Sequence, residues 1–257
     1  MSESILRADE RLDKVNEHIA LIQKKDGLTF GTDAYLLAAF IKAQRNAYAV
    51  ELGAGTGIIS LLLAARQKLA HIDALEIQED FCELTQRNVE YNKMSDMIRV
   101  IRADVRDVRA DTLGREADVV FSNPPYMTKD SGKRNVSDRK YIARHEVCGG
   151  IYDFCAAAYR LLKHGGRFYC VWRPDRLTSL ISSMRANRLE PKSLVFVHSD
   201  MNSEPSMVLV SATKGAAEGL KMLPPLFMYD TQAGDNGERR MSCRAESIYA
   251  TMSFYEE

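Results

Sequence analysis

The sequence predicts an α/β fold with a doubly wound, Rossmann-like sheet of seven mostly parallel strands and an antiparallel C-terminal edge strand. Three observations support this prediction. Short apolar strand patterns alternate with helical patterns from residue 47 onward. A glycine-rich turn, Gly53 to Gly57, follows the first of these strands and opens a helix. The last two strand patterns, 193–199 and 206–214, leave too little room between them for a helix, so they should pair antiparallel.

Each expected element follows from a local pattern of apolar residues. Strands are expected, in chain order, at 47–53, 71–77, 98–104, 117–123, 167–172, 193–199 and 206–214. Helices are expected at 34–43, 57–67, 79–93, 151–163 and 175–187. The pair Gly165-Gly166 should stop the fourth of these helices, and Pro174 should lie near the start of the fifth. In a sheet of this kind, ligands bind at the carboxyl ends of the strands.

Composition limits the class of protein. The chain has 257 residues, of which 46% are hydrophobic, which is enough for a large core. Lys and Arg together number 35, as do Asp and Glu, so a wholly basic nucleic-acid-binding surface is excluded but a local basic patch is not. Five cysteines without a C-x-x-C pair argue against a disulfide framework or a structural zinc site and fit the cytoplasm. Neither a signal peptide nor a membrane span is expected, since the start is polar and no apolar run reaches about 20 residues.

The ends of the first three strands carry the residues of a nucleoside pocket. The glycine loop "ELGAGTGI" contains Gly53, Gly55 and Gly57, which allow a tight turn and close approach to a ligand. Its G-x-G-x-G spacing departs from the dinucleotide fingerprint, so the helix start after it could instead take the carboxylate of an amino acid. Glu76 ends the second strand and is placed to accept from both ribose hydroxyls. Asp104 ends the third strand and could accept from an adenine amino group.

These features resemble the class I S-adenosylmethionine-dependent methyltransferases over about residues 20 to 215. The resemblance rests on "VELGAGTG", Glu76, Asp104 and "NPPY". It implies that S-adenosylmethionine is the cofactor, with its methionine part in the glycine loop, its ribose at Glu76 and its adenine at Asp104. The residues that match the cofactor-binding positions are Glu51, Gly53, Gly55, Gly57, Glu76, Asp104 and Asn123.

The fourth strand ends in "NPPY", which suits the activation of a weakly nucleophilic amine. An amino nitrogen conjugated to a ring or a carbonyl is a poor nucleophile because its lone pair is delocalised. The side-chain carbonyl of Asn123 and the backbone carbonyl of Pro124 can accept its two hydrogens, which shifts the nitrogen toward tetrahedral. Pro124 and Pro125 fix the direction of that carbonyl, and Tyr126 offers a face for a planar substrate. We expect these four residues to be catalytic, with no strongly basic residue and no metal.

Three short segments resemble the bacterial tRNA(Val) adenine-N6 methyltransferases, which modify the adenine beside the anticodon. They are "FGTDAYLL", "IARHE" and the tail "LPPLFMYD…SIY". The resemblance implies that RNA, and tRNA in particular, is the partner, and that Thr32 and Asp33 line the cofactor pocket. Either residue could instead simply cap the helix that follows. The oligomeric state is left open.

The polar stretch 127–149 follows directly on the "NPPY" corner and is rich in basic residues. Its position suits contacts to the phosphates that flank the target base, whereas the alternative is an ordinary solvated loop. The residues expected to contact RNA are Lys133, Arg134, Arg139 and Lys140. We expect one methyltransferase domain over 1–257, with an N-terminal extension and lid at 1–45, a catalytic core at 46–214 and a tail at 215–257 packed on the core.

Three alternatives share some of these features. "NPPY" also resembles the motif of enzymes that methylate guanine N2 or a glutamine side-chain amide. The guanine-N2 rRNA methyltransferases often have a duplicated domain, which is absent here. Protein-glutamine N5 methyltransferases have a helical domain before the core, for which about 45 residues are too few. A non-catalytic RNA-binding module is disfavoured by the intact "NPPY" motif.

Overall fold

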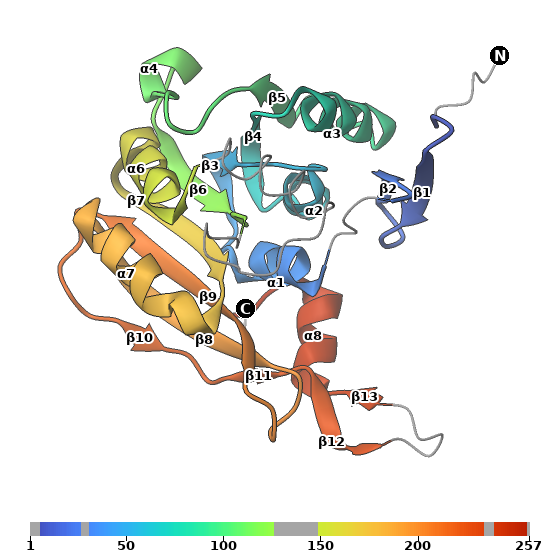
Figure 1. Cartoon of the computed structure of the whole chain (residues 1–257), viewed down its shortest axis with the longest axis vertical. Helices are drawn as coiled ribbons and strands as arrows, with labels where there is room; N and C mark the ends of the chain where they lie inside the picture. Colours follow the sequence, from blue (N-terminus) through green and yellow to red (C-terminus); the bar gives the residue numbers. More distant parts are fainter. Residues whose placement is uncertain (1–5, 27–30, 126–148, 234–238, 256–257) are drawn as a thin grey trace, which may run out of the picture.

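The computed structural model describes residues 6–26, 31–125, 149–233 and 239–255. Within these ranges, one sheet of nine strands has helices on both faces (Figure 1). Its strands are β3 (Gln44–Leu52), β4 (Leu69–Glu76), β5 (Ile98–Arg102), β6 (Ala117–Ser122), β7 (Leu162–Trp172), β8 (Leu189–His198), β9 (Pro205–Lys214), β10 (Lys221–Met222) and β11 (Leu226–Phe227).

The strand order is β10-β8-β9-β7-β6-β3-β4-β5, with β11 also paired to β8. Strands β7, β6, β3, β4 and β5 are parallel, whereas β9 is antiparallel to both β7 and β8. The predicted doubly wound fold is therefore confirmed, as is the antiparallel pairing of the last two predicted strands. A short hairpin joins β8 to β9, and β9 pairs with β7 on its other side. The sheet has nine strands, whereas seven were predicted, because the two-residue strands β10 and β11 also pair with β8.

Seven α-helices are described: α1 (Thr32–Phe40), α2 (Ile58–Ala65), α3 (Glu79–Tyr91), α4 (Ala110–Leu113), α6 (Ile151–Leu161), α7 (Leu177–Ala186) and α8 (Cys243–Thr251). The sheet separates two hydrophobic cores. One core contains residues of α1, α2 and α8, and the other contains residues of α6 and α7. Side chains of β6 alternate between them, since Val119 and Phe121 belong to the first and Val120 to the second. This alternation leaves the strand ends, rather than the faces, available for a site.

The Gly-Gly pair at 165–166 does not stop helix α6, so this part of the prediction was wrong. The helix ends at Leu161 and β7 begins at the next residue. The two glycines lie inside β7, where its register with β6 shifts. Ala117 of β6 pairs with Leu162, whereas Val119 pairs with Arg167, so the residues between Leu162 and Arg167 form a bulge. Gly165 has φ +76°. A bulge in a strand uses such a residue as readily as a helix end does. Pro174 begins a short 3-10 turn, η1 (Pro174–Arg176), directly before α7.

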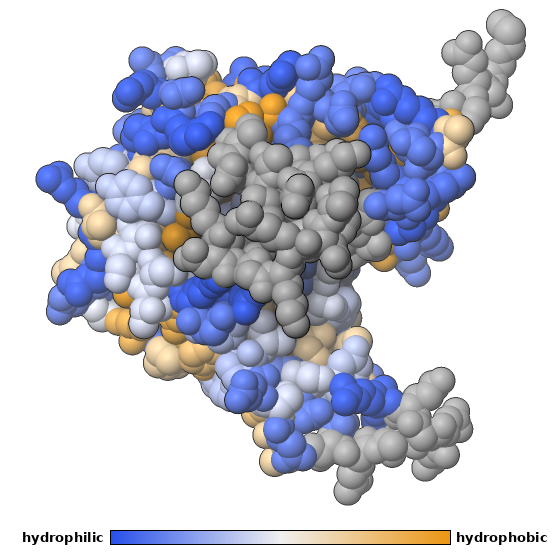
Figure 2. Space-filling model, in the orientation of Figure 1, coloured by the Kyte–Doolittle hydropathy of each residue, from blue (hydrophilic) through white to orange (hydrophobic). Residues whose placement is uncertain are grey.

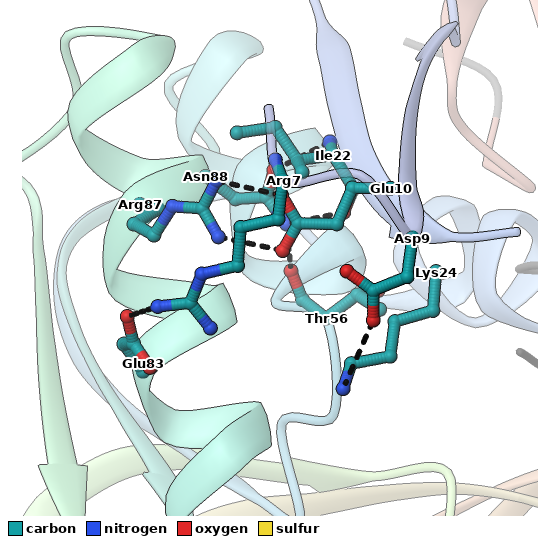
Figure 3. Close-up of polar contacts among 9 residues, drawn as sticks. All are labelled: Arg7, Asp9, Glu10, Ile22, Lys24, Thr56, Glu83, Arg87 and Asn88. Carbon is teal, nitrogen blue, oxygen red and sulfur yellow. Dashed lines mark hydrogen bonds and ion pairs between the residues drawn. The ribbon is translucent and has the colours of Figure 1, made fainter. Parts of the chain in front are cut away.

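A hairpin that the sequence did not predict, β1 (Glu10–Lys14) with β2 (Ala20–Lys24), lies against α3 (Figure 1). The buried side chain of Asn88 accepts from the Ile22 amide at 2.7 Å and donates to the Ile22 carbonyl at 3.1 Å. Asn92, one turn later, makes the same pair of hydrogen bonds to Ala20. Arg87 forms a two-pronged ion pair with Glu10, at 2.6 and 2.7 Å (Figure 3). Side chains of α3 therefore hold the hairpin.

The C-terminal segment contains a second hairpin, β12 (Tyr229–Ala233) with β13 (Arg239–Met241), followed by α8. Helix α8 contacts α1, where the rings of Tyr35 and Tyr249 stack with centroids 4.4 Å apart. The buried Nζ of Lys68 donates to the carbonyls of Ala38, Ala39 and Met252 at 2.9, 3.2 and 3.0 Å. One lysine side chain, whose pKa is lowered to about 7 by burial, thereby joins the C-terminal ends of α1 and α8. The proposed domain limits at 45 and 214 stay a prediction.

The surface seen in Figure 2 is mainly hydrophilic over α3 and α4. Hydrophobic colour gathers beside β8 and β10, where Met222 is 57% exposed. Across the described ranges, no helix is both long enough and apolar enough to cross a membrane.

Candidate functional site

Adjacent parallel strands bring the predicted site residues to one edge of the sheet. Leu52 at the end of β3 pairs with Leu75 of β4, and Glu76 pairs with Arg102 at the end of β5. On the other side of β3, Glu51 pairs with Phe121 of β6. The glycine loop, Glu76, Asp104 and Asn123 therefore follow four neighbouring strand ends, as the sequence predicts for a ligand site.

The glycine loop has a left-handed backbone at all three glycines, with φ of +72° at Gly53, +57° at Gly55 and +78° at Gly57. Such values strain any residue with a Cβ. At Gly57 a Cβ would also lie 2.7 Å from Cγ2 of Thr85. At Gly55 it would meet nothing within 4 Å, so the loop is open to a ligand at that residue.

Helix α3 holds the loop through two buried side chains. The Thr85 hydroxyl donates to the Gly55 carbonyl at 2.6 Å. The Asn88 amide donates to the Thr56 carbonyl at 3.0 Å, so Asn88 lies between the loop and Ile22 of the hairpin (Figure 3). Neither Thr85 nor Asn88 carries a sequence signal for this role, because the pattern of an amphipathic helix does not show which polar side chains hydrogen-bond to a neighbouring loop.

Glu76 is 4% exposed, and its carboxylate contacts the loop from the β4 side. One oxygen accepts from the Gly55 amide at 2.9 Å and the other from the Gln78 amide at 2.9 Å. Burial raises the pKa of this carboxyl, against the opposing effect of the backbone hydrogen bonds. The Ile77 amide and the Gln78 side chain also lower this pKa by hydrogen bonding, so a ligand hydroxyl at Glu76 would share the carboxylate with protein donors.

Glu51, expected to bind the cofactor, lies deeper in the protein. Glu51 is the second-last residue of β3. Its side chain is buried and accepts a hydrogen bond from the hydroxyl of Ser60 on α2. Burial raises the pKa of Glu51 to about 8. The structure therefore shows Glu51 joining β3 to α2, the two elements that flank the glycine loop, and its partner Ser60 was not predicted.

Asp104 lies after β5 and is paired with Arg106. The Arg106 Nε lies 2.9 Å from both carboxylate oxygens, and the Arg106 backbone amide donates to Oδ1 at 2.8 Å. Hydrogen bonds from Arg106 hold the pKa of Asp104 below its usual value. An amino group that binds Asp104 therefore shares this carboxylate with the Arg106 guanidinium.

Asn123 follows β6, whose end is tied to β3 by the Ser122 hydroxyl, a donor to the Leu52 carbonyl at 2.7 Å. The side-chain nitrogen of Asn123 donates to Oδ2 of Asp33 at 2.7 Å. Thr32 and Asp33 form the start of α1. The contact between Asp33 and Asn123 was not predicted. Pro124 and Pro125 follow directly. The predicted residues outside the described part of the chain are Tyr126, Lys133, Arg134, Arg139 and Lys140.

A cavity of about 660 Å³ lies beside the start of α1. It is lined by Thr32, Asp33, 172–175 and 204–207. Its size is within the range of small-molecule pockets. Because Asp33 is both a lining residue and the partner of Asn123, the cavity adjoins the "NPPY" corner.

The site fits a nucleoside that carries an amino acid. The open backbone at Gly55 suits the amino-acid part, and the carboxylates of Glu76 and Asp104 suit hydroxyl and amino donors. Among the described residues, no group of three or more His, Cys, Asp or Glu side chains is placed to hold a metal ion.

Comparison with known proteins agrees with this geometry. The family model described as the methyltransferase small domain matches residues 24–187, which is more than half of the chain. The chain belongs to this family. This methyltransferase is 34% identical over 181 residues to the tRNA1(Val) (adenine(37)-N6)-methyltransferase of Phocaeicola vulgatus, covering 70% of the chain and 75% of that protein. It is 30% identical over 186 residues to the equally named protein of Parabacteroides distasonis, covering 72% and 77%.

Among solved structures, a predicted O-methyltransferase from Agrobacterium tumefaciens superposes with a TM-score of 0.69, covering 88% of the methyltransferase and 99% of that chain. At 22% identity, this likeness shows the shared fold. The predictions of an S-adenosylmethionine-dependent methyltransferase and of its cofactor are confirmed.

Proposed function

We propose that this methyltransferase transfers a methyl group from S-adenosylmethionine to N6 of an adenine in tRNA, specifically the adenine beside the anticodon of tRNA(Val). The names of the relatives from Phocaeicola vulgatus and Parabacteroides distasonis support the substrate. The single observation that carries the chemistry is the position of Asn123, directly after β6 and one strand away from the glycine loop. A tRNA substrate would be met in the cytoplasm, the compartment that we expect.

The cofactor-binding roles in this proposal follow the strand ends. The glycine loop holds the methionine part, Glu76 the ribose and Asp104 the adenine. Glu51 contributes indirectly, because its hydrogen bond with Ser60 fixes the start of α2 under the loop. When bound, S-adenosylmethionine supplies an electrophilic methyl group on its sulfonium.

In this proposal the "NPPY" corner activates the adenine amino group that accepts the methyl group. The side-chain oxygen of Asn123 and the backbone carbonyl of Pro124 accept the two hydrogens of adenine N6. The nitrogen lone pair then points away from the ring, toward the methyl group, and forms the new N–C bond as the S–C bond breaks. One proton leaves the nitrogen to solvent after the transfer, so no strongly basic side chain is required.

The cavity lined by Asp33 and Trp172 is the proposed entrance for the acceptor base. Tyr126 would stack on the base, and the basic residues of 127–149 would contact the neighbouring phosphates. The chain would act as one domain, with 1–45 as its extension and lid and 215–257 as its packed tail.

Incubation of the protein with labelled S-adenosylmethionine and unmodified total tRNA, followed by mass spectrometry of the nucleosides, tests the proposal. N6-methyladenosine supports it, and Asn123→Ala should abolish its formation. Parallel incubations with rRNA and with total protein test the alternatives, for which N2-methylguanosine or a methylated glutamine is the expected product. Binding of both cofactor and RNA without any transfer would indicate a non-catalytic module.

A further inference from the structure

We propose that Asp33 is a positioning residue, which orients and polarises the Asn123 carboxamide for methyl transfer; this inference rests on the proposed function. The sequence resemblance places Asp33 in the cofactor pocket. In the structure, its Oδ2 is the acceptor for the Asn123 side-chain nitrogen, at 2.7 Å. The two residues are 90 positions apart and belong to α1 and to the end of β6.

The chemistry of the two groups decides which way the amide faces. A carboxylate accepts hydrogen bonds and has none to donate, so the atom of Asn123 that faces Asp33 must be its NH₂ group. The side-chain oxygen then lies on the other side of the carboxamide, as the proposed acceptor for the substrate amine. In the reverse orientation Asn123 would present an NH₂ group to the amine, and two donors cannot bond.

The charge of Asp33 adds to this orientation. A hydrogen bond from an amide to a carboxylate draws electron density toward the amide oxygen and makes that oxygen a stronger acceptor. The substrate nitrogen becomes positive as its bond to carbon forms, so its N–H groups become stronger donors. The gain is therefore largest in the transition state, and it should appear in kcat more than in substrate binding.

Asp33 is itself held in place. Its other oxygen, Oδ1, accepts from the Ala34 amide at 2.9 Å. Gly31 leaves room for the carboxylate, because a Cβ at position 31 would lie only 2.6 Å from Oδ1. Residues 34–40 of α1 are buried, so the helix that carries Asp33 is fixed in the core. The contact joins two rigid elements, which is what a preorganised site requires.

The simpler role for Asp33 is that of an acidic residue in the first turn of α1, which would affect stability alone. Four single variants and one double variant separate the two roles. Asp33→Leu removes the acceptor, and Asp33→Asn retains an acceptor oxygen without the charge. Gly31→Ala keeps Asp33 but displaces its carboxylate. Asn123→Ala, alone and combined with Asp33→Leu, tests whether Asp33 acts through Asn123.

The measurements are kcat and KM for tRNA, cofactor affinity by calorimetry, and the melting temperature. Asp33→Leu should lower kcat about 10- to 100-fold, the usual effect of losing a partner that orients a reacting group, with KM and cofactor affinity nearly unchanged. Asp33→Asn should restore part of kcat, and Gly31→Ala should lower it. In the Asn123→Ala background, Asp33→Leu should have no further effect on any residual rate.

A readout independent of activity is the side-chain amide signal of Asn123 in ¹⁵N-labelled protein, assigned by its loss in Asn123→Ala. This signal should shift in Asp33→Leu and in Gly31→Ala. An unchanged signal, or normal kcat with weakened cofactor binding in Asp33→Leu, would overturn the inference. If the wild-type protein methylates no adenine while the amide signal shifts as expected, the proposed substrate is wrong and the contact between Asp33 and Asn123 stands.

Discussion

The hydroxyl of Thr85 donates to the carbonyl of Gly55 at 2.6 Å, from α3 to the most open residue of the glycine loop. This hydrogen bond holds the left-handed loop from the side of α3. The loop is therefore shaped by a neighbouring helix as well as by its own glycines.

Thr85→Val should weaken S-adenosylmethionine binding about 2- to 10-fold, because it removes one hydrogen bond without changing the shape of the side chain. Calorimetric titration measures this effect. Thr112→Val, at an exposed position of α4, is the matched control and should leave affinity unchanged. Equal affinities of the Thr85 variant and the wild type would show that the loop keeps its shape unaided.

Asp104→Ala should weaken cofactor binding about 10-fold, because the adenine amino group would lose a charged acceptor. Arg106→Ala should not weaken it, since the guanidinium shares the same carboxylate and its removal leaves Asp104 free for the ligand. Both affinities can be measured by the same titration. A large loss in Arg106→Ala would mean that the guanidinium, rather than Asp104, contacts the cofactor.

The free energy of unfolding should fall as pH rises from about 5 to 8, because of Glu51. Burial raises the pKa of Glu51 from 4.5 to about 8, so the folded protein keeps a proton that the unfolded chain releases. The stability that this proton gives is complete below about pH 4.5 and is lost as pH rises through about 8. Urea unfolding should show this loss, on the order of a few kcal/mol.

Glu51→Gln cannot ionise, so its stability should depend less on pH over the same range. Glu116→Gln, at an exposed position, is the control and should keep the wild-type dependence. Parallel curves for Glu51→Gln and the wild type would assign the pH dependence to other groups.

Lys68→Met should lower the free energy of unfolding by about 2 kcal/mol, because three carbonyls at the ends of α1 and α8 lose their donor. The measurement is chemical denaturation, with the exposed Lys221→Met as the control. A loss no larger than that of the control would mean that water replaces the ammonium group at these carbonyls.

The sequence predicted the core strands and the glycine loop because their signals are local. A left-handed turn needs glycine at fixed positions, and a strand end is marked by where an apolar run stops. The contact of Asp33 with Asn123 has no such signal, since it joins residues 90 positions apart. The partnership of Glu51 with Ser60 was missed for a different reason: a serine in an apolar helix looks the same whether its hydroxyl is bonded or not.

The first hairpin was missed because "ERLDK" is short and charged, whereas a buried strand is apolar. It pairs with β2, and the side chains that hold the two strands come from α3, more than sixty residues away. The Gly-Gly pair at 165–166 was predicted to end a helix but lies in a strand, since the same two residues suit a helix end and a strand bulge. Only the tertiary pairing of β7 with β6 decides between them.

The buried side-chain amide of Asn88 forms hydrogen bonds with two segments, at Ile22 of the first hairpin and at Thr56 of the glycine loop. Detachment of the hairpin would leave the Asn88 side chain without its partners at Ile22 and loosen its hold on Thr56. Deuterium uptake at the Ile22 amide should therefore slow when S-adenosylmethionine saturates the protein. This amide belongs to the hairpin and not to the glycine loop, and Asn88 connects the two. Ligand occupancy would be readable in an exchange rate at the hairpin.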